Sequence, residues 1–431
     1  MQSVHRGGAT TVARSIMAWV VGFAVGLFTT SAWCQTYSLT LLPSDIPGNT
    51  DPNFKALARG ISGDGNVIVG SGSSILSFLE KPYTWRKVGG VWTRSELPTI
   101  STTGRAVAAS YDGSVIVGMT GRYAEATTSF GTPAVWRDTA SAAPALETPF
   151  ITASPTGGPL RGIFNGVSAS GTRAFGFARE VTGNIASSNA YRYDQGSAPS
   201  AVATFGQLTG AYPAGNVMSA DGTRATHYIQ PGSVGGNNTV LLWNESTGSS
   251  VLPINSGSLY ARTTTISGDG RVVAGYLASV SGLANESGPA VIWRDGVFSQ
   301  LARPNNAINS FVAGSDTTGR VLVGAAGNNL DLVNFTTLVQ SASNTFAAIW
   351  IDGQAFSLST YLTSNGVNLG NVTPILVSGV SADGRTIVGV ATRPIGTTTQ
   401  REYVSFVATI PTPGSLFGMS LCVVAAMRRR R

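Results

Sequence analysis

A short pattern of polar turn residues followed by an apolar run recurs seven times along the chain. Its clearest copy, residues 61–70, reads Ile-Ser-Gly-Asp-Gly-Asn-Val-Ile-Val-Gly, and looser copies begin at residues 109, 167, 218, 266, 315 and 380. An Asp-Gly pair supplies the positive φ that a tight hairpin turn needs. A β-branched run such as Val67–Val69 is typical of a buried strand. Each copy therefore predicts a β-hairpin.

The spacing of these hairpins indicates the architecture. The residue before each turn glycine lies at position 64, 112, 170, 221, 269, 318 or 383, which gives intervals of 48, 58, 51, 48, 49 and 65 residues. A period near 50 is typical of a propeller blade rather than a short solenoid rung. An aromatic residue follows most turns by 20–23 residues, and we expect a packing role for this set: Trp85, Trp136, Tyr193, Trp243 and Trp293, with Trp350 arriving later and Phe406 in the last copy.

After the aromatic strand there is often a turn and one more strand, as at Val297–Leu301. Four strands per repeat predict an all-β fold, a seven-bladed β-propeller with four-stranded blades. The seventh repeat stops at its aromatic strand, Val404–Ala408, whereas residues 36–42 resemble the missing fourth strand. We therefore predict that residues 36–42 pair with residues 403–409 and close the ring, which protects the sheet edges.

The repeat also resembles a known family. The phrase Val380–Gly389, together with Ala-x-x-Trp-type strands such as Pro133–Arg137 and Pro289–Arg294, resembles the HAF repeat of extracellular bacterial proteins. The resemblance covers most of residues 56–408, although the histidine usual near the start of the second motif is absent. It implies a propeller and assigns no biochemical function.

The first 34 residues are predicted to be a secretory signal peptide. They contain basic residues and no acid, then an apolar run over residues 16–28 and small residues at Ala32 and Cys34. We expect cleavage after Cys34 or after Ala32. The alternative is an uncleaved anchor helix, and lipidation of Cys34 is disfavoured by the bulky Trp33 beside it.

The C-terminus has a Pro-x-Pro motif, a 14-residue apolar stretch and four final arginines. A helix of that length spans about 21 Å, short of a hydrocarbon core of about 30 Å, and its arginines would lie on the cytoplasmic side. The alternative is a core helix with a basic tail. The tail resembles the PEP-CTERM sorting signal, with Thr412 at a place usually held by Glu. The resemblance implies recognition by an exosortase-type enzyme at the bacterial inner membrane and release to the surface or the exopolysaccharide matrix, through the signal residues Pro411, Thr412, Pro413, Arg428, Arg429, Arg430 and Arg431.

These two ends change the charge of the chain. The whole sequence has 28 basic and 21 acidic residues, a net charge of +7. The predicted signal holds two of the basic residues and the tail four, so residues 35–410 have 28 − 6 = 22 basic and 21 acidic residues, a net charge of +1. Cys34 and Cys422 leave as well, so the predicted domain needs no disulfide. Nucleic-acid binding is not expected at this charge. The predicted organisation is a signal peptide over 1–34, a propeller over 35–410 and a sorting signal over 411–431, and we expect a monomer.

Few residues point to chemistry, and we predict no catalytic, cofactor or metal site. His227 is the one histidine between residues 35 and 410, and we favour an irregular strand end in the fourth blade over a base or metal ligand near the ring centre. No Gly-x-Ser-x-Gly elbow, zinc spacing, calcium loop or phosphate loop occurs. Asp64, Asp112, Asp221, Asp269 and Asp383 are expected to serve their own turns. We expect the arginines that precede hairpins to face one rim: Arg59, Arg105, Arg161 and Arg262.

These features favour a secreted, surface-sorted propeller that acts as a binding or structural module of the envelope or exopolysaccharide matrix. One rival hypothesis is a polysaccharide lyase or hydrolase that uses acidic residues at the mouth of the ring. Two facing carboxylates about 5–10 Å apart would favour that enzyme, whereas a rim of Ser, Thr and Asn would favour binding. Another rival is a protein-docking scaffold, which a large exposed apolar patch would favour.

Overall fold

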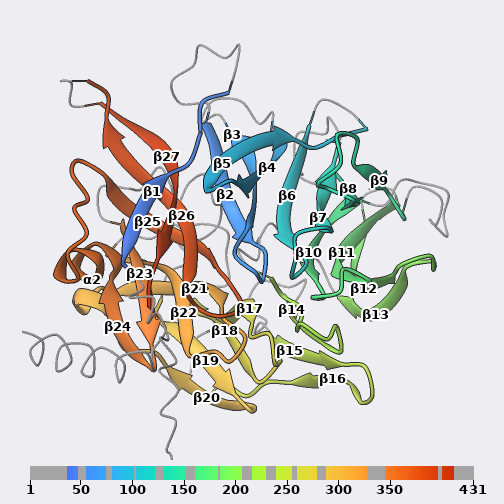
Figure 1. Ribbon diagram of the computed structural model, residues 1–431. Coiled ribbons are helices and arrows are strands. Elements are labelled where there is room, and N and C mark those ends of the chain that lie inside the picture. Colours follow the sequence, from blue (N-terminus) through green and yellow to red (C-terminus); the bar gives the residue numbers. More distant parts are fainter. Residues whose placement is uncertain are drawn as a thin grey trace, which may run out of the picture. The chain divides into compact units, whose positions relative to one another are not determined.

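The computed structural model describes residues 36–46, 55–73, 80–100, 103–121, 131–150, 161–182, 185–205, 216–229, 239–254, 260–278, 288–328, 345–396 and 400–411. These residues form seven antiparallel sheets, arranged as a seven-bladed β-propeller (Figure 1). The predicted fold class is confirmed.

Blades 1 to 3 follow one another along the chain, and in each the innermost strand comes first. Blade 1 contains β2 (Lys55–Ile61), β3 (Val67–Ser73), β4 (Lys81–Val88) and β5 (Val91–Glu96). Blade 2 contains β6 (Gly104–Ala109), β7 (Ile116–Thr120), β8 (Thr132–Arg137) and β9 (Ala145–Glu147). Blade 3 contains β10 (Arg161–Val167), β11 (Arg173–Thr182), β12 (Ile185–Asp194) and β13 (Ser200–Phe205).

Blades 4 to 7 continue this order. Blade 4 contains β14 (Arg224–Ile229), β15 (Thr239–Asn244) and β16 (Gly248–Val251). Blade 5 contains β17 (Tyr260–Ile266), β18 (Val272–Ala278), β19 (Ala290–Arg294) and β20 (Val297–Gln300). A 3₁₀ turn, η1 (Pro304–Asn306), leads to blade 6, which contains β21 (Asn309–Ser315), β22 (Val321–Gly327), β23 (Thr345–Ile351) and β24 (Gln354–Ser357). Blade 7 contains β25 (Thr373–Val380), β26 (Thr386–Pro394), β27 (Arg401–Thr409) and β1 (Ser38–Leu41).

Blade 4 has three named strands, and its innermost place is taken by a short segment. Met218 forms an isolated antiparallel bridge with Ala225. The amide of Thr226 donates to the carbonyl oxygen of Val217 at 3.0 Å. Residues 217 and 218 therefore pair with β14 where the other blades have a full strand.

The ring closes as predicted. Strand β1 pairs antiparallel with β27, with Ser38 opposite Thr409 and Leu41 opposite Phe406. Figure 1 shows this blue strand beside the red strands of blade 7. The next amide, that of Leu42, donates to the carbonyl oxygen of Ser405 at 2.8 Å. Closure gives the last blade the outer strand that its own repeat lacks, so the third strand is not left as an open edge.

The two ends of the propeller differ. At one end, which we call the turn face, tight hairpins join the first strand of a blade to the second and the third to the fourth. In blade 1 these two turns touch, because the amide of Lys87 donates to the carbonyl oxygen of Asn66 at 3.2 Å. At the other end, the loop face, the second strand leads to the third and each blade leads to the next.

A closed ring of backbone hydrogen bonds joins the turns of all seven blades. The ring begins where the amide of Asp64 donates to the carbonyl oxygen of Tyr111, and it returns to blade 1 where Ala382 donates to Gly63. The donor–acceptor distances are 2.7–3.3 Å, and the remaining pairs are Tyr111–Ala169, Ala169–Ala220, Ala220–Gly268, Gly268–Asp316, Asp269–Thr317 and Thr317–Ala382. Each turn thus supports the next, so the turn face is rigid around its whole circumference.

The turn glycines are required by this packing. Gly113 has a φ of 67°, and a Cβ added to it would lie 2.4 Å from Cβ of Val67 in the preceding blade. The other turn glycines repeat the arrangement, each against a residue at or just before the start of the second strand of the preceding blade. Glycine therefore serves both the backbone conformation and the contact between blades.

The aromatic residues at the repeated position are buried, as predicted. Four of them also link neighbouring blades, because the indole N–H donates to a carbonyl oxygen just beyond the outer strand of the preceding blade. These bonds measure 2.6–2.9 Å and join Trp85 to Pro43, Trp136 to Pro98, Trp293 to Pro253 and Trp350 to Ala302. A buried indole N–H needs such an acceptor.

Blade 7 replaces this link with a helix. The long interval before the last repeat contains α2 (Leu358–Ser364), which buries Leu358 and Leu362. Both leucines pack in the cluster that holds Phe406, the aromatic residue of blade 7. The insertion thus fills the space between blades 6 and 7 where Phe406 has no indole to donate.

Candidate functional site

A small cavity of about 50 Å³ lies between the inner strands at the centre of the ring, and no carboxylate is among the described residues that line it. Glycines let the inner strands approach, since a Cβ on Gly60 would lie 2.5 Å from the carbonyl oxygen of Val107. The polar residues in the lining are Asn216, Thr265, Ser315 and Ser378.

The prediction that the arginines before the hairpins face one rim is wrong for Arg59 and Arg105. Arg59 and Arg105 are buried and converge on Glu80, which is buried as well. Arg105 forms a two-point ion pair with Glu80, with one Nη2–Oε1 distance of 2.8 Å, and Arg59 approaches the same oxygen at 3.5 Å. A register shift between Ala58 and Gly60 displaces Arg59 from the regular alternation of β2. The cluster therefore ties blades 1 and 2 together inside the fold.

Of the other two arginines, Arg262 is also interior, and Arg161 is not tested. Arg262 is 2% exposed on β17. The side chain of Arg161 lies outside the described part of the chain. The arginines before the hairpins are thus interior residues wherever the structure describes them, because the inner strands pack against neighbouring blades.

The repeated aspartates serve their own turns, as predicted. Asp64 accepts hydrogen bonds from the amide of Asn66, at 3.0 Å, and from the hydroxyl of Ser62. Burial alone would raise the pKa of Asp112, but hydrogen bonds from Ser114 and Ser110 outweigh it and lower that pKa. Asp221, Asp269 and Asp383 repeat the contacts to the serine and to the following amide. These carboxylates are therefore committed to structure.

His227 lies within β14, opposite Leu241, rather than at a strand end. Both ring nitrogens are shielded from solvent, and the ring lies 6.0 Å from that of Phe175. Burial lowers the pKa of His227 to about 3. The imidazole is thus neutral at physiological pH. Within the described residues, no group of three or more His, Cys, Asp and Glu side chains lies close enough to hold a metal ion.

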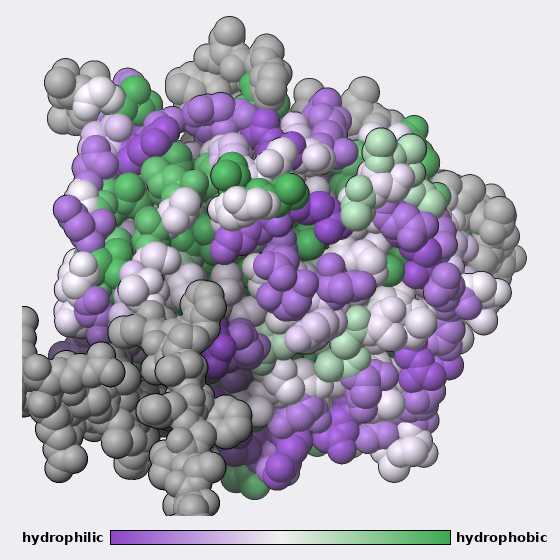
Figure 2. Space-filling view, in the orientation of Figure 1, coloured by the Kyte–Doolittle hydropathy of each residue, from purple (hydrophilic) through white to green (hydrophobic). Residues whose placement is uncertain are grey.

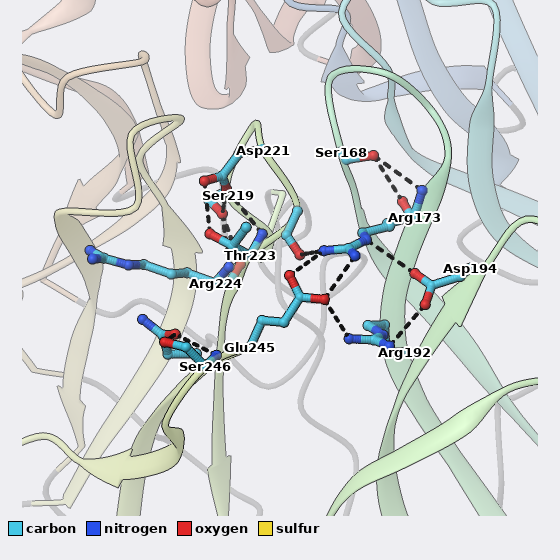
Figure 3. A network of polar contacts seen from close by, with 12 residues as sticks. Ser168, Arg173, Arg192, Asp194, Ser219, Asp221, Thr223, Arg224, Glu245 and Ser246 are labelled. Atoms are coloured by element: carbon cyan, nitrogen blue, oxygen red, sulfur yellow. Dashed lines mark hydrogen bonds and ion pairs between the residues drawn. The ribbon is translucent and has the colours of Figure 1, made fainter.

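A network of four charged side chains joins blades 3 and 4 at the turn face (Figure 3). Glu245 accepts two hydrogen bonds from Arg173, at 2.7 and 2.8 Å, and a third from Arg192 at 3.1 Å. Asp194 lies 3.2 Å from Arg173 and 2.9 Å from Arg192. The hydrogen bonds from Arg173 lower the pKa of Glu245. The four side chains are only 23–36% exposed and are paired with one another, so the network serves to join the two blades.

A cavity with the dimensions of a ligand site lies where the ring closes. It has a volume of about 490 Å³, in the range of small-molecule sites, and we call it the closure groove. Figure 2 shows hydrophobic residues gathered over the region where blades 7 and 1 lie side by side. Three parts of the chain line the groove: residues within and just after β1, residues at the turn before β5 and at its start, and two residues of blade 7. They are Thr40, Leu41, Leu42, Pro43, Ser44, Asp45, Gly90, Val91, Trp92, Arg393 and Val404.

Charged side chains at the groove form a chain of ion pairs. Lys55 contacts both Asp45 and Glu402, the latter at 2.9 Å, and Glu402 lies 2.6 Å from Arg393. The hydrogen bond from Lys55 lowers the pKa of Asp45, so its carboxylate is ionised. The Asp45 side chain is 82% exposed and that of Arg393 is 37% exposed, whereas Lys55 and Glu402 are nearly buried. The groove therefore offers one accessible anion and one accessible cation on a fixed support.

Sequence reasoning did not find the closure groove. Its lining comes from three separate stretches, around residues 40–45, 90–92 and 393–404, which closure brings together. The predicted pairing of residues 36–42 with the last strand was the one available signal. Likewise, the Leu-Pro pairs at residues 42–43, 97–98 and 252–253 mark the carbonyl acceptors of the indoles, but their role depends on the neighbouring blade.

The sorting signal falls largely outside the described residues. Pro411 is described and buried, and it lies two residues after the end of β27. Thr412, Pro413 and Arg428 to Arg431 are not described, nor is the predicted signal peptide. No helix in the described ranges is long and apolar enough to cross a membrane.

No model of a known protein family matches the chain, and no curated protein is similar to it. Several solved structures are similar to the chain. A puromycin hydrolase is 14% identical with a TM-score of 0.52, over 85% of this chain and 55% of the hydrolase. A Kuenenia stuttgartiensis hydrazine synthase is 15% identical with a TM-score of 0.46, over 80% and 95% of the two chains. A Pyrococcus horikoshii acylaminoacyl peptidase is 13% identical with a TM-score of 0.44, over 85% and 54%.

These likenesses extend to the propeller fold alone. The chain spans about half the length of the hydrolase and peptidase that it matches. At identities of 10–15% they assign no activity to it.

Proposed function

We propose that this protein is a secreted, monomeric propeller that binds a component of the bacterial envelope or exopolysaccharide matrix. The signal peptide carries it across the inner membrane, and an exosortase-type enzyme processes its C-terminal tail on the way to the surface. The proposal of delivery rests on the two sequence signals. The proposal of binding rests on the closure groove.

The groove has the chemistry of a saccharide site. It combines an apolar wall, including Trp92 and Val91, with the accessible carboxylate of Asp45 and the guanidinium of Arg393. Sugars present C–H faces to aromatic and aliphatic surfaces and hydroxyls to charged acceptors and donors, which few polar groups in an apolar site can orient. The volume of about 490 Å³ suits one or two sugar units.

The channel lining supports binding over polysaccharide cleavage. Retaining and inverting glycosidases both need two carboxyl groups about 5–10 Å apart across the scissile bond. The described channel residues are small, apolar, hydroxyl or amide side chains. Glu80, the buried acid between blades 1 and 2, is held by two arginines.

The test is a polysaccharide-binding array with the chain of residues 35–410. Asp45→Asn and Arg393→Gln should each weaken glycan binding about tenfold, since a charged hydrogen bond contributes about 1.5–3 kcal/mol. A matched control is the exposed pair of blade 5, through Asp295→Asn and Arg271→Gln, which should leave binding unchanged. The same samples are assayed for new reducing ends and unsaturated uronates. Loss of binding in the control variants, or turnover of a bound polysaccharide, would refute the binding-module proposal.

A further inference from the structure

Both ends of the propeller chain leave the fold at the same place. Strands β1 and β27 are antiparallel, and their register puts Ser38 directly opposite Thr409. The next residue, Ile410, donates its amide to the carbonyl oxygen of Arg385 at 2.8 Å. Arg385 belongs to the hairpin turn between β25 and β26, so this exit point lies on the turn face.

The connection from this point to the apolar tail is short. Residues 410–413 separate Thr409 from the 14-residue apolar stretch, and two of these four are prolines. A fully extended chain gains at most about 3.6 Å per residue, so the tail begins within about 18 Å of Thr409. Strand β27 alone has nine residues, and at about 3.3 Å per residue it places the loop face about 30 Å from the exit point.

We infer that the tethered protein faces the phospholipid bilayer with its turn face and presents its loop face outward. The connection is too short to pass around the blade, so a tail held in the membrane keeps the turn face beside it. The predicted cleavage site after Cys34 lies four residues before Ser38, so the N-terminus starts from the same side. This inference rests on the proposed function and concerns the chain before its tail is processed, while the apolar stretch of residues 414–427 holds it in the membrane.

The construction of the turn face fits that position. Its hairpin turns are joined by a closed ring of backbone hydrogen bonds, so the backbone groups in that ring are already paired. Some of its exposed charges are paired, as in Arg271 with Asp295 and Arg320 with Asp352. Valines stand at its hairpin tips, with Val88 67% and Val297 70% exposed.

Exposed aliphatic residues on both faces provide matched labelling sites. Val88 and Val297 lie on the turn face, whereas Ile100 and Ile308, 52% and 58% exposed, lie in connections at the loop face. The amide of Ile100 donates to Thr120 Oγ1, and the amide of Ile308 donates to Asn328 Oδ1. Thr120 is the last residue of β7 and Asn328 follows β22, so both acceptors lie at the loop-face end of a second strand. Each site is replaced singly by cysteine in the full chain, with Cys34→Ser and Cys422→Ser removing the native thiols.

The experiment reconstitutes the labelled full chain into phosphatidylethanolamine–phosphatidylglycerol vesicles that contain a nitroxide-headgroup lipid. We expect the fluorophore at Val88→Cys or Val297→Cys to be quenched at least about threefold more than at Ile100→Cys or Ile308→Cys, since the faces are about 30 Å apart. Flotation with equal quenching at both faces, or stronger quenching at the loop face, overturns the orientation alone. Failure to float, or flotation unchanged by deletion of residues 412–431, overturns the tether and the orientation together.

Discussion

The buried histidine of blade 4 makes stability depend on pH in a way that can be assigned to one side chain. His227 has a folded-state pKa of about 3, against an ordinary value of 6.5, because of burial. The neutral imidazole is therefore the form that the folded state tolerates. Above pH 6.5 the imidazole is neutral in both the folded and the unfolded chain, so its titration does not lower the free energy of unfolding there. As the pH falls below 6.5, the unfolded chain binds a proton that the folded chain does not, and stability is lost.

The size of the effect follows from these two pKa values. One pKa unit corresponds to about 1.36 kcal/mol, so the loss approaches about 5 kcal/mol near pH 3. Between pH 7 and pH 5, where the unfolded chain gains most of one proton, the loss is about 2 kcal/mol. Residues 35–410 contain no second histidine, so other contributions in this interval come from carboxylates alone.

The assay is urea unfolding of the wild type and of His227→Phe at pH 7.0 and pH 5.0. Phenylalanine keeps an aromatic ring beside Phe175 and removes the titration. We expect the free energy of unfolding to fall by about 2 kcal/mol more in the wild type than in the variant. The reasoning is refuted if the two proteins lose the same stability between the two pH values, or if the imidazole titrates near 6.5 in the folded protein by NMR.

Three further outcomes follow from the packing of the ring. Gly113→Ala should lower the free energy of unfolding by about 1–3 kcal/mol more than Gly248→Ala does. Both glycines have positive φ, but only a Cβ added at Gly113 would meet Val67. Equal thermal shifts in the two variants would contradict this. Ser405→Ala should lower the free energy of unfolding by about 1–3 kcal/mol, and a loss below about 0.5 kcal/mol would count against this expectation. The Ser405 hydroxyl donates to the carbonyl oxygen of Ala56 and accepts from a buried amide. Deletion of residues 36–42 should expose the edge of the last blade and cause self-association in light scattering, and a monodisperse monomer would show that closure is dispensable.

The blades could be predicted because each repeat carries its own turn chemistry. The Ser-x-Asp-Gly turns draw their serine and aspartate hydrogen bonds from residues within five positions of one another, so the pattern is complete within the sequence itself. The closing strand was predictable for a related reason. Repeat seven lacks a fourth strand, and residues 36–42 have the length and alternation to supply one.

Features that depend on two blades could not be read in this way. Arg59 and Arg105 appear in sequence as exposed charges before a hairpin, but Glu80 from the connection between β3 and β4 takes both into the interior. The closure groove is a similar case, since Asp45, Trp92 and Arg393 meet through closure of the ring. Local periodicity fixes which face of a strand is apolar. It does not say which neighbour a polar residue on that strand will find.

Arginines that donate to the turns make the same contact in several blades from different positions in the repeat. In blades 1, 2 and 5 the arginine after the tryptophan donates to the carbonyl oxygen of the turn glycine in the next blade, as Arg86 does to Gly113 at 2.9 Å. Blades 3 and 4 have no arginine at that place, and one from the second strand reaches the equivalent carbonyl, as Arg224 does to Gly270 at 3.2 Å. What these blades share is the buried carbonyl acceptor of the turn glycine, because an unpaired carbonyl between blades is costly. Its arginine donor can come from either the second or the third strand of the preceding blade. A search for a repeated arginine column would miss this equivalence, and a count of basic residues would mistake these structural donors for a binding surface.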